Sequence, residues 1–273
     1  MNMKTTTTRL EQIADVYSID DRLTAFTTTR RGGCSSGNYA SMNVNGFCGD
    51  NPADVACNRK ILSDLLQISI DRLIMPHQVH GTVVCRVDEA ILQLSPEERA
   101  GFLEGADAVM TDTEEVCVGV STADCTPIIL YDTQHVAVCV AHAGWRGTLQ
   151  RIVVKALDAM HNAYGTESAY VRAVIGPCIS TDNFEVGDEV YDAFCSAGFP
   201  MDIVSVRMAK WHIDLKECNR WLLAQCGVST DNELVSPACT YAMPERYFSA
   251  RRLGTASGRL FTGAIIRQRV NEM

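Results

Sequence analysis

The 273-residue sequence has no long apolar run and no excess of positive charge. No stretch reaches the roughly 18 apolar residues of a membrane helix, and the segment MNMKTTTTRLEQ lacks the apolar core of a secretory signal. We therefore expect no membrane association and a cytoplasmic location. With 24 Lys and Arg against 33 Asp and Glu, the net charge is -9. This charge argues against a nucleic-acid partner, because nucleic-acid binding depends on basic surfaces.

The sequence also lacks any Cys-x-x-Cys pair among its twelve cysteines. Such pairs are typical of structural zinc sites, so a closed structural zinc site is not expected. Some cysteines, such as Cys117 in VCVGV and Cys139 in VAVCVAHA, lie in apolar runs where a thiol acts as a small hydrophobic group. We expect most of the twelve to fill the core in a reducing compartment.

Strand-like and helix-like segments alternate along the chain, without a repeat or a low-complexity linker. Apolar runs predict strands at residues 116–120, 128–131, 136–141 and 171–175. Capping and turn residues predict helices that begin at Asn51-Pro52 and Ser95-Pro96, and others from about Thr148 to Gly165 and from about Asp214 to Cys226. The fold class is therefore α+β (mixed α/β). We expect a single domain over residues 1–273, with central mixed β-sheets covered by helices and residues 1–20 as a peripheral N-terminal segment.

Three residues far apart in the sequence form a possible metal-ligand set. His80 lies in PHQVHG, Cys125 in STADCTP and His142 in AHAGWRG. Two imidazoles and one thiolate are typical zinc ligands, and a three-residue set leaves the fourth tetrahedral position for chemistry. Cys125 follows a strand that we expect to end near Ser121, and His142 follows the strand at 136–141. A single cysteine between strands is usually a packing residue, and a single histidine is usually a hydrogen-bonded or surface group. Spacing therefore leaves a shared site and unrelated roles both open.

The segment HAGWRGT suggests a second kind of chemistry. Gly144 and Gly147 permit a tight backbone directly before the helix expected from Thr148, whose N-terminus would attract an anion. Arg146 would add a donor suited to phosphate. The alternative is a plain turn with Trp145 packed and Arg146 solvated. His77, three residues before His80, could be a ligand, a partner of a ligand or a proton carrier.

Seven segments, in this order, resemble the polyphenol oxidase or laccase-domain family over nearly the whole chain. They are TTTRRGGCSSGNYASMNVN (27–45), HQVHG, GADAVMTD (105–112), STADCTPI, HAGWRGT, IGPCI (175–179) and FEVGDEV (184–190). The resemblance implies the laccase-domain (cysteine-hydrolase-like) fold and zinc held by His80, Cys125 and His142. It also implies phosphorolysis of adenosine, inosine and methylthioadenosine, and deamination of adenosine. The implied partners are purine nucleosides and phosphate, and the oligomeric state stays open.

The C-terminal segment departs from the family pattern. Family members usually have a segment like S-x-R-R-D-G-x-T-G-R, whereas SARRLGTASGR is one residue longer and lacks the Asp. The resemblance therefore leaves the roles of Arg251, Arg252 and Arg259 open.

The motifs suggest roles for the residues around the expected metal. Deamination needs an activated water to attack C6 of the purine, and phosphorolysis needs a bound phosphate and a protonated leaving purine. We place phosphate near Arg146, with Asn43 and Arg59 as further candidates.

Proton transfer is the second role to fill. His77, Asp124 and Cys125 are the catalytic candidates, and Gln78 is a candidate for a polar contact with substrate. Asp124 could instead be a turn residue or orient a ligating histidine.

Three other functions compete with this interpretation. Cys125 and His142 could be the nucleophile and base of a cysteine hydrolase. Some bacterial relatives of the family are described as peptidoglycan editing factors, which would make a muropeptide precursor the ligand. A conventional multicopper oxidase needs on the order of ten histidines, and this sequence has six. Copper in the zinc site could still support weak oxidation of phenols by a copper-dependent polyphenol oxidase.

Overall fold

The computed structural model describes residues 9–268, which form two large mixed β-sheets and one small sheet. The five-stranded sheet has the order β1-β2-β14-β6-β3, and the six-stranded sheet the order β13-β9-β7-β8-β5-β4. Both sheets contain parallel and antiparallel pairs. The predicted mixed α/β class is therefore confirmed.

The five-stranded sheet combines strands from both ends of the described chain with two strands from the part between them. They are β1 (Ala14–Tyr17), β2 (Leu23–Thr28), β3 (Leu73–Ile74), β6 (Cys117–Thr122) and β14 (Leu260–Ile266). The C-terminal strand β14 lies between β2 and β6 and pairs antiparallel with both. This pairing brings the segment before β14 to the end of β6.

The six-stranded sheet is formed by a mostly contiguous part of the chain. Its strands are β4 (Val83–Arg86), β5 (Ala106–Thr111), β7 (Thr126–Asp132), β8 (Ala137–Ala143), β9 (Val171–Ile175) and β13 (Glu233–Val235). The strand predicted at 171–175 is confirmed with its bounds, and the three other predicted strands differ by one or two residues at their ends. His142 lies inside β8 and not after it, because β8 stays paired with β7 as far as Ala143.

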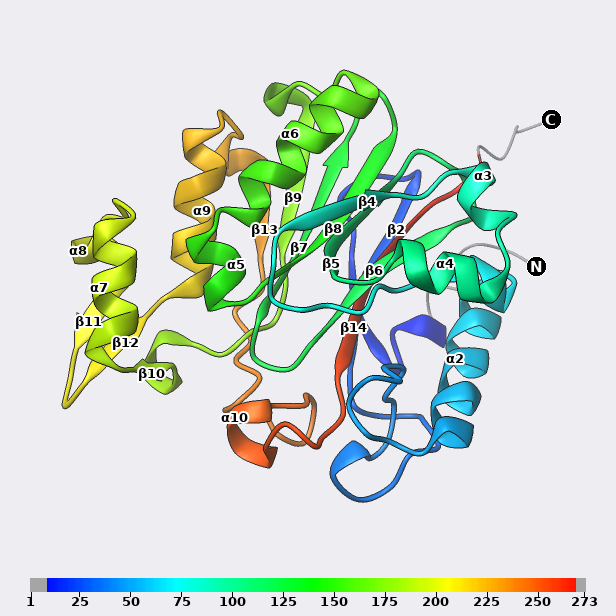
Figure 1. Cartoon of the computed structure of the whole chain (residues 1–273), viewed down its shortest axis with the longest axis horizontal. Coiled ribbons are helices and arrows are strands. Elements are labelled where there is room, and N and C mark those ends of the chain that lie inside the picture. The colour runs from blue at the N-terminus through cyan, green and yellow to red at the C-terminus, as the bar shows by residue number, and fades with distance from the viewer. Residues whose placement is uncertain (1–8, 269–273) are drawn as a thin grey trace.

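The two large sheets pack face to face, and helices cover their outer faces. Val118 and Ala264 of one sheet share a core with Ile129 and Val140 of the other. The helices α5 (Trp145–Leu149), α6 (Ile152–Tyr164) and α9 (Leu215–Gln225) cover the outer face of the six-stranded sheet, and α2 (Pro52–Leu66) covers the five-stranded sheet (Figure 1). The core is therefore a four-layer arrangement, in which apolar strands are buried on both sides.

Local signals fix where most of the helices begin and end. Asn51 caps α2 through a hydrogen bond from the Ala53 amide, and the short helices α3 (Glu89–Leu92) and α4 (Pro96–Phe102) follow β4. Ser95 and Glu98 form the predicted capping box of α4. Asp214 caps α9, and Gly165 ends α6 in a left-handed conformation.

The helix predicted to begin near Thr148 is two helices. The helix α5 already begins at Trp145, after Gly144, and α6 begins at Ile152. Arg151 between them has a φ of 62°, which interrupts the regular helix. A sequence pattern of apolar spacing does not detect such a break, because both helices present their apolar side chains to the same sheet.

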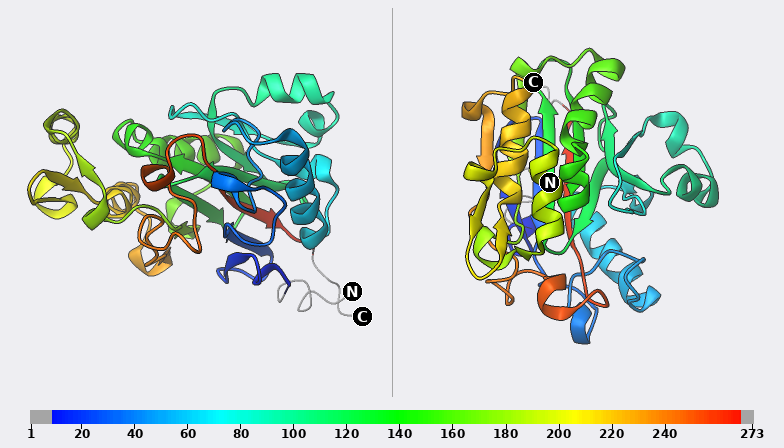
Figure 2. Two further views of the ribbon diagram at one scale, coloured as in Figure 1. Left: turned by 90° about the horizontal axis from the view of Figure 1, so that it is seen from below. Right: turned by 60° about the vertical axis from the view of Figure 1, so that its left-hand side comes forward.

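A small unit projects from one side of the molecule (Figures 1 and 2). It consists of β10 (Glu185–Val186), β11 (Ser205–Arg207) and β12 (Trp211–Ile213), with α7 (Asp188–Ser196) and α8 (Met201–Val204). The last helix, α10 (Ala250–Leu253), and the loop that precedes α2 both lie towards the lower end of β14 in Figure 1. Within residues 9–268 no helix has the length and apolar character to cross a membrane.

The cysteines and the N-terminal segment only partly follow the prediction. Six free cysteines are buried, at positions 85, 117, 139, 178, 218 and 239, whereas Cys34 and Cys57 form a disulfide.

Of the segment predicted to be peripheral, residues 1–8 lie outside the described part of the chain. Leu10 and Ala14 are buried, and β1 is an edge strand of the five-stranded sheet. Residues 10–17 are therefore part of the packed fold.

Candidate metal centre and pocket

The structure brings His80, Cys125 and His142 together. Their nitrogen and sulfur ligand atoms all lie within 4.8 Å of one another, and the His80 and His142 ring centroids are 4.8 Å apart. Pro127 of β7 pairs with His142 of β8, so the turn before β7 carries Cys125 to the side of His142. His80 comes from the loop between β3 and β4, where it has a φ of 62°. Of the residues that the structure describes, this is the one metal-ligand cluster found.

Gly144 of the HAGWRG segment is required by close packing against this cluster. A β-carbon at position 144 would lie 2.8 Å from the Cys125 sulfur and 3.3 Å from Cδ2 of His80. Real side chains do not approach that closely, so any other residue would displace a ligand. The glycine that the sequence suggested for tight anion binding thus makes room for the ligands.

Asp107 of β5 holds the His142 ring and the main chain at His80 in place. The sequence analysis assigned Asp107 no role. Its fully buried carboxylate accepts hydrogen bonds from His142 Nδ1 at 2.7 Å and from the His80 amide at 3.0 Å. It also accepts the amides of Val79 and Gly81. Burial raises the pKa of this carboxyl, but these hydrogen bonds outweigh burial and hold the pKa below its ordinary value.

Because Nδ1 of His142 is bound to Asp107, Nε2 is the nitrogen left for the cluster. Burial raises the pKa of Cys125, but the charge and hydrogen bonds of His142 lower it by more, so the thiol has a pKa well below its ordinary value. Burial lowers the pKa of His142, while Cys125 and Asp107 raise it by more. Without metal, the pair therefore favours a thiolate beside an imidazolium.

A pocket of about 790 Å³ opens over the cluster. Its size is in the range of small-molecule sites. The residues that line it are Asn45, Phe47, Cys48, His77, Gln78, His80, Ser121, Thr122, Ala123, Asp124, Cys125, His142, Ile179, Phe184, Ala250, Arg251, Thr255, Ala256 and Arg259. The pocket thus combines five parts of the fold: the loop before α2, the loop between β3 and β4, the ends of the central strands, the segment after β9, and the segment before β14.

Three of the predicted site residues line this pocket in addition to the metal ligands. Gln78 is bound to Ser121 of β6, with its Oε1 accepting from the Ser121 amide at 2.7 Å. His77 Nδ1 lies 2.7 Å from Glu104, which holds the ring in place. Asp124 accepts hydrogen bonds from the hydroxyl groups of Thr240 and Ser249 and from the Arg251 amide. The Asp124 carboxylate therefore links the segment before β14 to the turn that carries Cys125.

The other three predicted residues do not line the pocket. Asn43 is fully buried, and its amide oxygen accepts the main-chain N–H of Arg259 at 3.0 Å. Arg59 of α2 donates to the Val44 carbonyl. Arg146 is exposed, with its guanidinium 4.2 Å from the centre of the Trp145 ring. Asn43 thus supports the pocket from behind. Arg146 is solvated, as in the alternative, but it lies in the first turn of α5 and not on a plain turn.

Two arginines of the divergent C-terminal segment line the pocket instead. The Arg259 guanidinium donates to the carbonyls of Ser257 at 2.6 Å and Thr255 at 2.9 Å, so its own loop holds it. Arg251 donates from both terminal nitrogens to the Glu185 carbonyl at 3.1 Å. The sequence left both roles open, because this segment departs from the family pattern. In the structure, the pairing of β14 with β6 brings the segment to the pocket.

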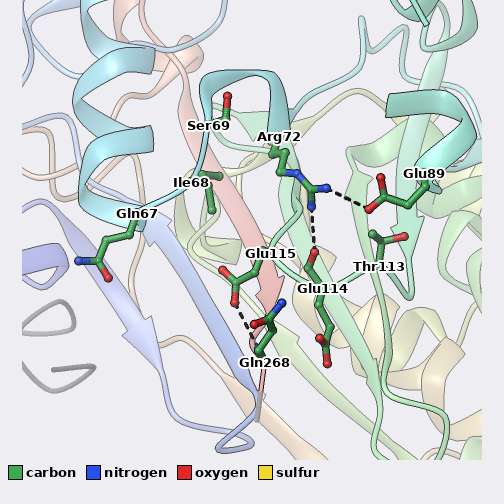
Figure 3. Close-up of a pocket in the computed structure, with 9 residues that line it drawn as sticks. All are labelled: Gln67, Ile68, Ser69, Arg72, Glu89, Thr113, Glu114, Glu115 and Gln268. Atoms are coloured by element: carbon green, nitrogen blue, oxygen red, sulfur yellow. Dashed lines mark hydrogen bonds and ion pairs between the residues drawn. The ribbon is translucent and has the colours of Figure 1, made fainter. Parts of the chain in front are cut away.

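A second hollow, of about 520 Å³, lies away from the cluster (Figure 3). Arg72 lies at its centre, 2.9 Å from Glu89 and 3.1 Å from the Glu114 carbonyl, and the Gln268 amide donates to Glu115 (Figure 3). Its lining contains no histidine or cysteine. These charges are satisfied within the protein, so the pocket over the metal cluster is the candidate active site.

Known proteins resemble this chain over nearly its whole length. The sequence model of the family described as multi-copper polyphenol oxidoreductase laccase matches residues 24–267. A purine nucleoside phosphorylase of Bacteroides thetaiotaomicron is 42% identical over 244 residues, which are 88% of this chain and 90% of the relative. Adenosine deaminase RL5, from an unknown prokaryotic organism, is 39% identical over 257 residues, 93% of this chain and 97% of the relative.

The fold agrees with this relationship. The crystal structure of YlmD from Geobacillus stearothermophilus matches with a TM-score of 0.86 and 29% identity, covering 92% of this chain and 94% of that one. The resemblance drawn from the seven sequence segments is confirmed. The chain belongs to the multi-copper polyphenol oxidoreductase laccase family, whose relatives include proteins named purine nucleoside phosphorylase and adenosine deaminase.

Proposed function

We propose that this protein is a zinc-dependent purine nucleoside phosphorylase that acts on adenosine, inosine and methylthioadenosine and also deaminates adenosine. The observation that carries the proposal is the cluster of His80, Cys125 and His142 in a pocket of nucleoside size. The names of the two relatives described above support the same pair of reactions.

The donor set fits zinc. Neighbouring ligand atoms in a tetrahedral zinc site are roughly 3.5 Å apart, so the cluster needs only a small contraction. Asp107 fixes His142 in the tautomer that presents Nε2, as carboxylates commonly do for zinc-bound histidines. A zinc ion bound there would supply a Lewis acid to polarise a substrate or water oxygen. Copper could occupy the same donors, and a metal assay distinguishes the two.

Arg259 and Arg251 are our candidates for binding phosphate, in place of Arg146 and Arg59. Both line the pocket, and a guanidinium offers paired donors to phosphate oxygens. The one carboxylate that lines the pocket belongs to Asp124, and three hydrogen bonds engage it. An anion in the pocket would therefore face two arginines and little competing negative charge.

In phosphorolysis, a phosphate oxygen forms a bond to the ribose C1′ while the bond from C1′ to the purine nitrogen breaks. The bonding electrons leave with the purine, which then takes up a proton. The sequence suggested His77 for delivering that proton, but Glu104 holds its ring and the Phe47 ring covers one of its faces, so we assign His77 to the wall of the pocket. In deamination, water adds at C6 and ammonia leaves. We assign Asp124 to holding the pocket loops, since three hydrogen bonds engage its two oxygens.

A cysteine hydrolase is the second candidate, and one observation favours it. Asp107, His142 and Cys125 form a hydrogen-bonded line that resembles the acid, base and nucleophile of a catalytic triad. A zinc-bound thiolate should resist alkylation until a chelator removes the metal, whereas a free nucleophile should react at once. Alkylation of the protein as purified therefore separates the two candidates.

The test is release of free base from adenosine and inosine, with and without phosphate, together with ammonia release and metal content. We expect the native protein to release base only when phosphate is present. In His80→Ala and Cys125→Ala, we expect both the zinc content and the base release to fall. Cys195→Ala is the matched control, because Cys195 is exposed and outside the pocket. A folded, zinc-loaded protein that releases neither base nor ammonia would overturn the proposal.

A further inference from the structure

Phe47 is an exposed aromatic side chain in the loop before α2, and it lines the pocket. Its side chain is 55% exposed. The ring stacks on the imidazole of His77, with 4.2 Å between centroids and 23° between planes. The imidazole covers one face of the ring, and the high exposure indicates that the other face is open.

Neighbouring residues hold both rings in position. The Phe47 amide donates to Oδ1 of Asn45 at 2.6 Å, and the Asn45 side-chain nitrogen donates to Ser121 Oγ at 2.6 Å. Asn45 is buried, so it ties the Phe47 loop to the end of β6. On the other side, Glu104 holds His77 through Nδ1 at 2.7 Å. The stack is therefore built before any ligand arrives.

A preformed aromatic surface at the wall of a pocket suits a planar ligand. Every nucleobase has a π-face, and stacking on an aromatic side chain tolerates different ring substituents. Other exposed apolar side chains of this protein, such as Tyr170 and Ile203, lie outside the pocket. Phe47 differs from them in stacking on a held imidazole and in lining the pocket that opens over the metal cluster.

We propose that Phe47, supported by His77, is the platform on which the nucleobase stacks, and that it gives the site its preference for purines. The inference rests on the proposed function and names the residue that selects the base. A purine offers a larger stacking face than a pyrimidine, and its substituents at C6 stay free for chemistry. One platform would therefore accept adenosine, inosine and methylthioadenosine alike.

The kinetic test compares Phe47→Leu and Phe47→Trp with the native protein. Loss of stacking in Phe47→Leu should raise the KM for inosine about tenfold, with the KM for phosphate unchanged. Phe47→Trp should keep or lower the KM for inosine. Tyr170→Leu removes another exposed ring that is outside the pocket and should change neither value. An unchanged KM for inosine in Phe47→Leu, or an equal rise in both KM values, would overturn the platform.

A binding test is independent of turnover. The fluorescence of 2-aminopurine riboside falls when the base stacks, so we expect quenching by the native protein and its loss in Phe47→Leu. Equal quenching by the two proteins, or none by the native protein, would overturn the inference. Quenching that depends on Phe47, without base release from any nucleoside, would contradict the proposed function and leave the platform standing.

Discussion

The carboxylate of Asp107 and the imidazole of His142 lie 2.7 Å apart in the core between the strands, and both side chains are almost completely buried. The same carboxylate accepts the amides on both sides of His80 as well as that of His80 itself. One residue therefore orients two of the proposed metal ligands, which come from different elements of the fold.

Substituting Asp107 should weaken metal binding. Asp107→Asn keeps the size of the side chain but loses the charge that supports His142, and we expect a 10- to 100-fold lower zinc affinity. Competition with a chromogenic chelator measures the affinity. Asp132→Asn is the matched control, because Asp132 is a buried carboxylate bound to His135 away from the cluster. Equal zinc affinity in native protein and Asp107→Asn would contradict this role.

Alkylation of Cys125 should depend on metal and on pH. In metal-free protein His142 lowers the pKa of Cys125, so iodoacetamide should modify this residue rapidly at pH 7, where an ordinary thiol is mostly protonated. In His142→Ala the pKa should rise, and the rate at pH 7 should fall relative to the rate at pH 9. Mass spectrometry of the Cys125 peptide reports the rate. Identical pH profiles in the two proteins would show that His142 does not activate the thiol.

Loss of Arg259 should mainly affect phosphate. Removing a charged hydrogen-bond donor typically costs about 1.5–3 kcal/mol, so Arg259→Ala should raise the KM for phosphate by roughly 10- to 100-fold and the KM for inosine much less. Arg207→Ala is the control, since Arg207 is an exposed arginine outside the pocket. A rise in the KM for phosphate with Arg146→Ala, but not with Arg259→Ala, would support the candidate that the sequence suggested.

Asp124→Asn should reduce stability. Asn tolerates the φ of 87° at this position. It nevertheless replaces one acceptor oxygen by an NH₂ group that faces the hydroxyls of Thr240 or Ser249, or the Arg251 amide. We expect a loss of about 1–3 kcal/mol in the free energy of unfolding, measured with denaturant. Unchanged stability with lost turnover would instead favour a direct role in proton transfer.

The sequence predicted the cluster of His80, Cys125 and His142 better than it predicted the residues around the cluster. Three residues in turn-rich motifs indicated the ligand set, and strand pairing in the structure places them together. The sequence could not assign Asp107 a role, because an aspartate within an apolar strand shows no partner until the sheet is formed. Apolar runs predicted four of the strands to within two residues at their ends, whereas the break at Arg151 depends on how two helices pack on one sheet.

For the residues proposed to bind phosphate, the structure differs from the sequence prediction. Arg146 was singled out because glycines and a predicted helix start surround it, but the helix begins three residues earlier and the side chain faces solvent. Arg259 lies more than 130 residues after Cys125, and the pairing of β14 with β6 brings both residues to one pocket. Long-range strand order decides this placement, and local sequence patterns do not carry that information.

The most direct test measures zinc content and phosphate-dependent release of hypoxanthine from inosine on the same preparations of native protein and Cys125→Ala. We predict about one zinc per native chain, because the described residues contain a single such cluster. We also predict base release only when phosphate is present. Cys125→Ala should lose both together. Phosphate-dependent release at the native rate by zinc-free Cys125→Ala would contradict the claim that this cluster holds the metal at the reaction centre.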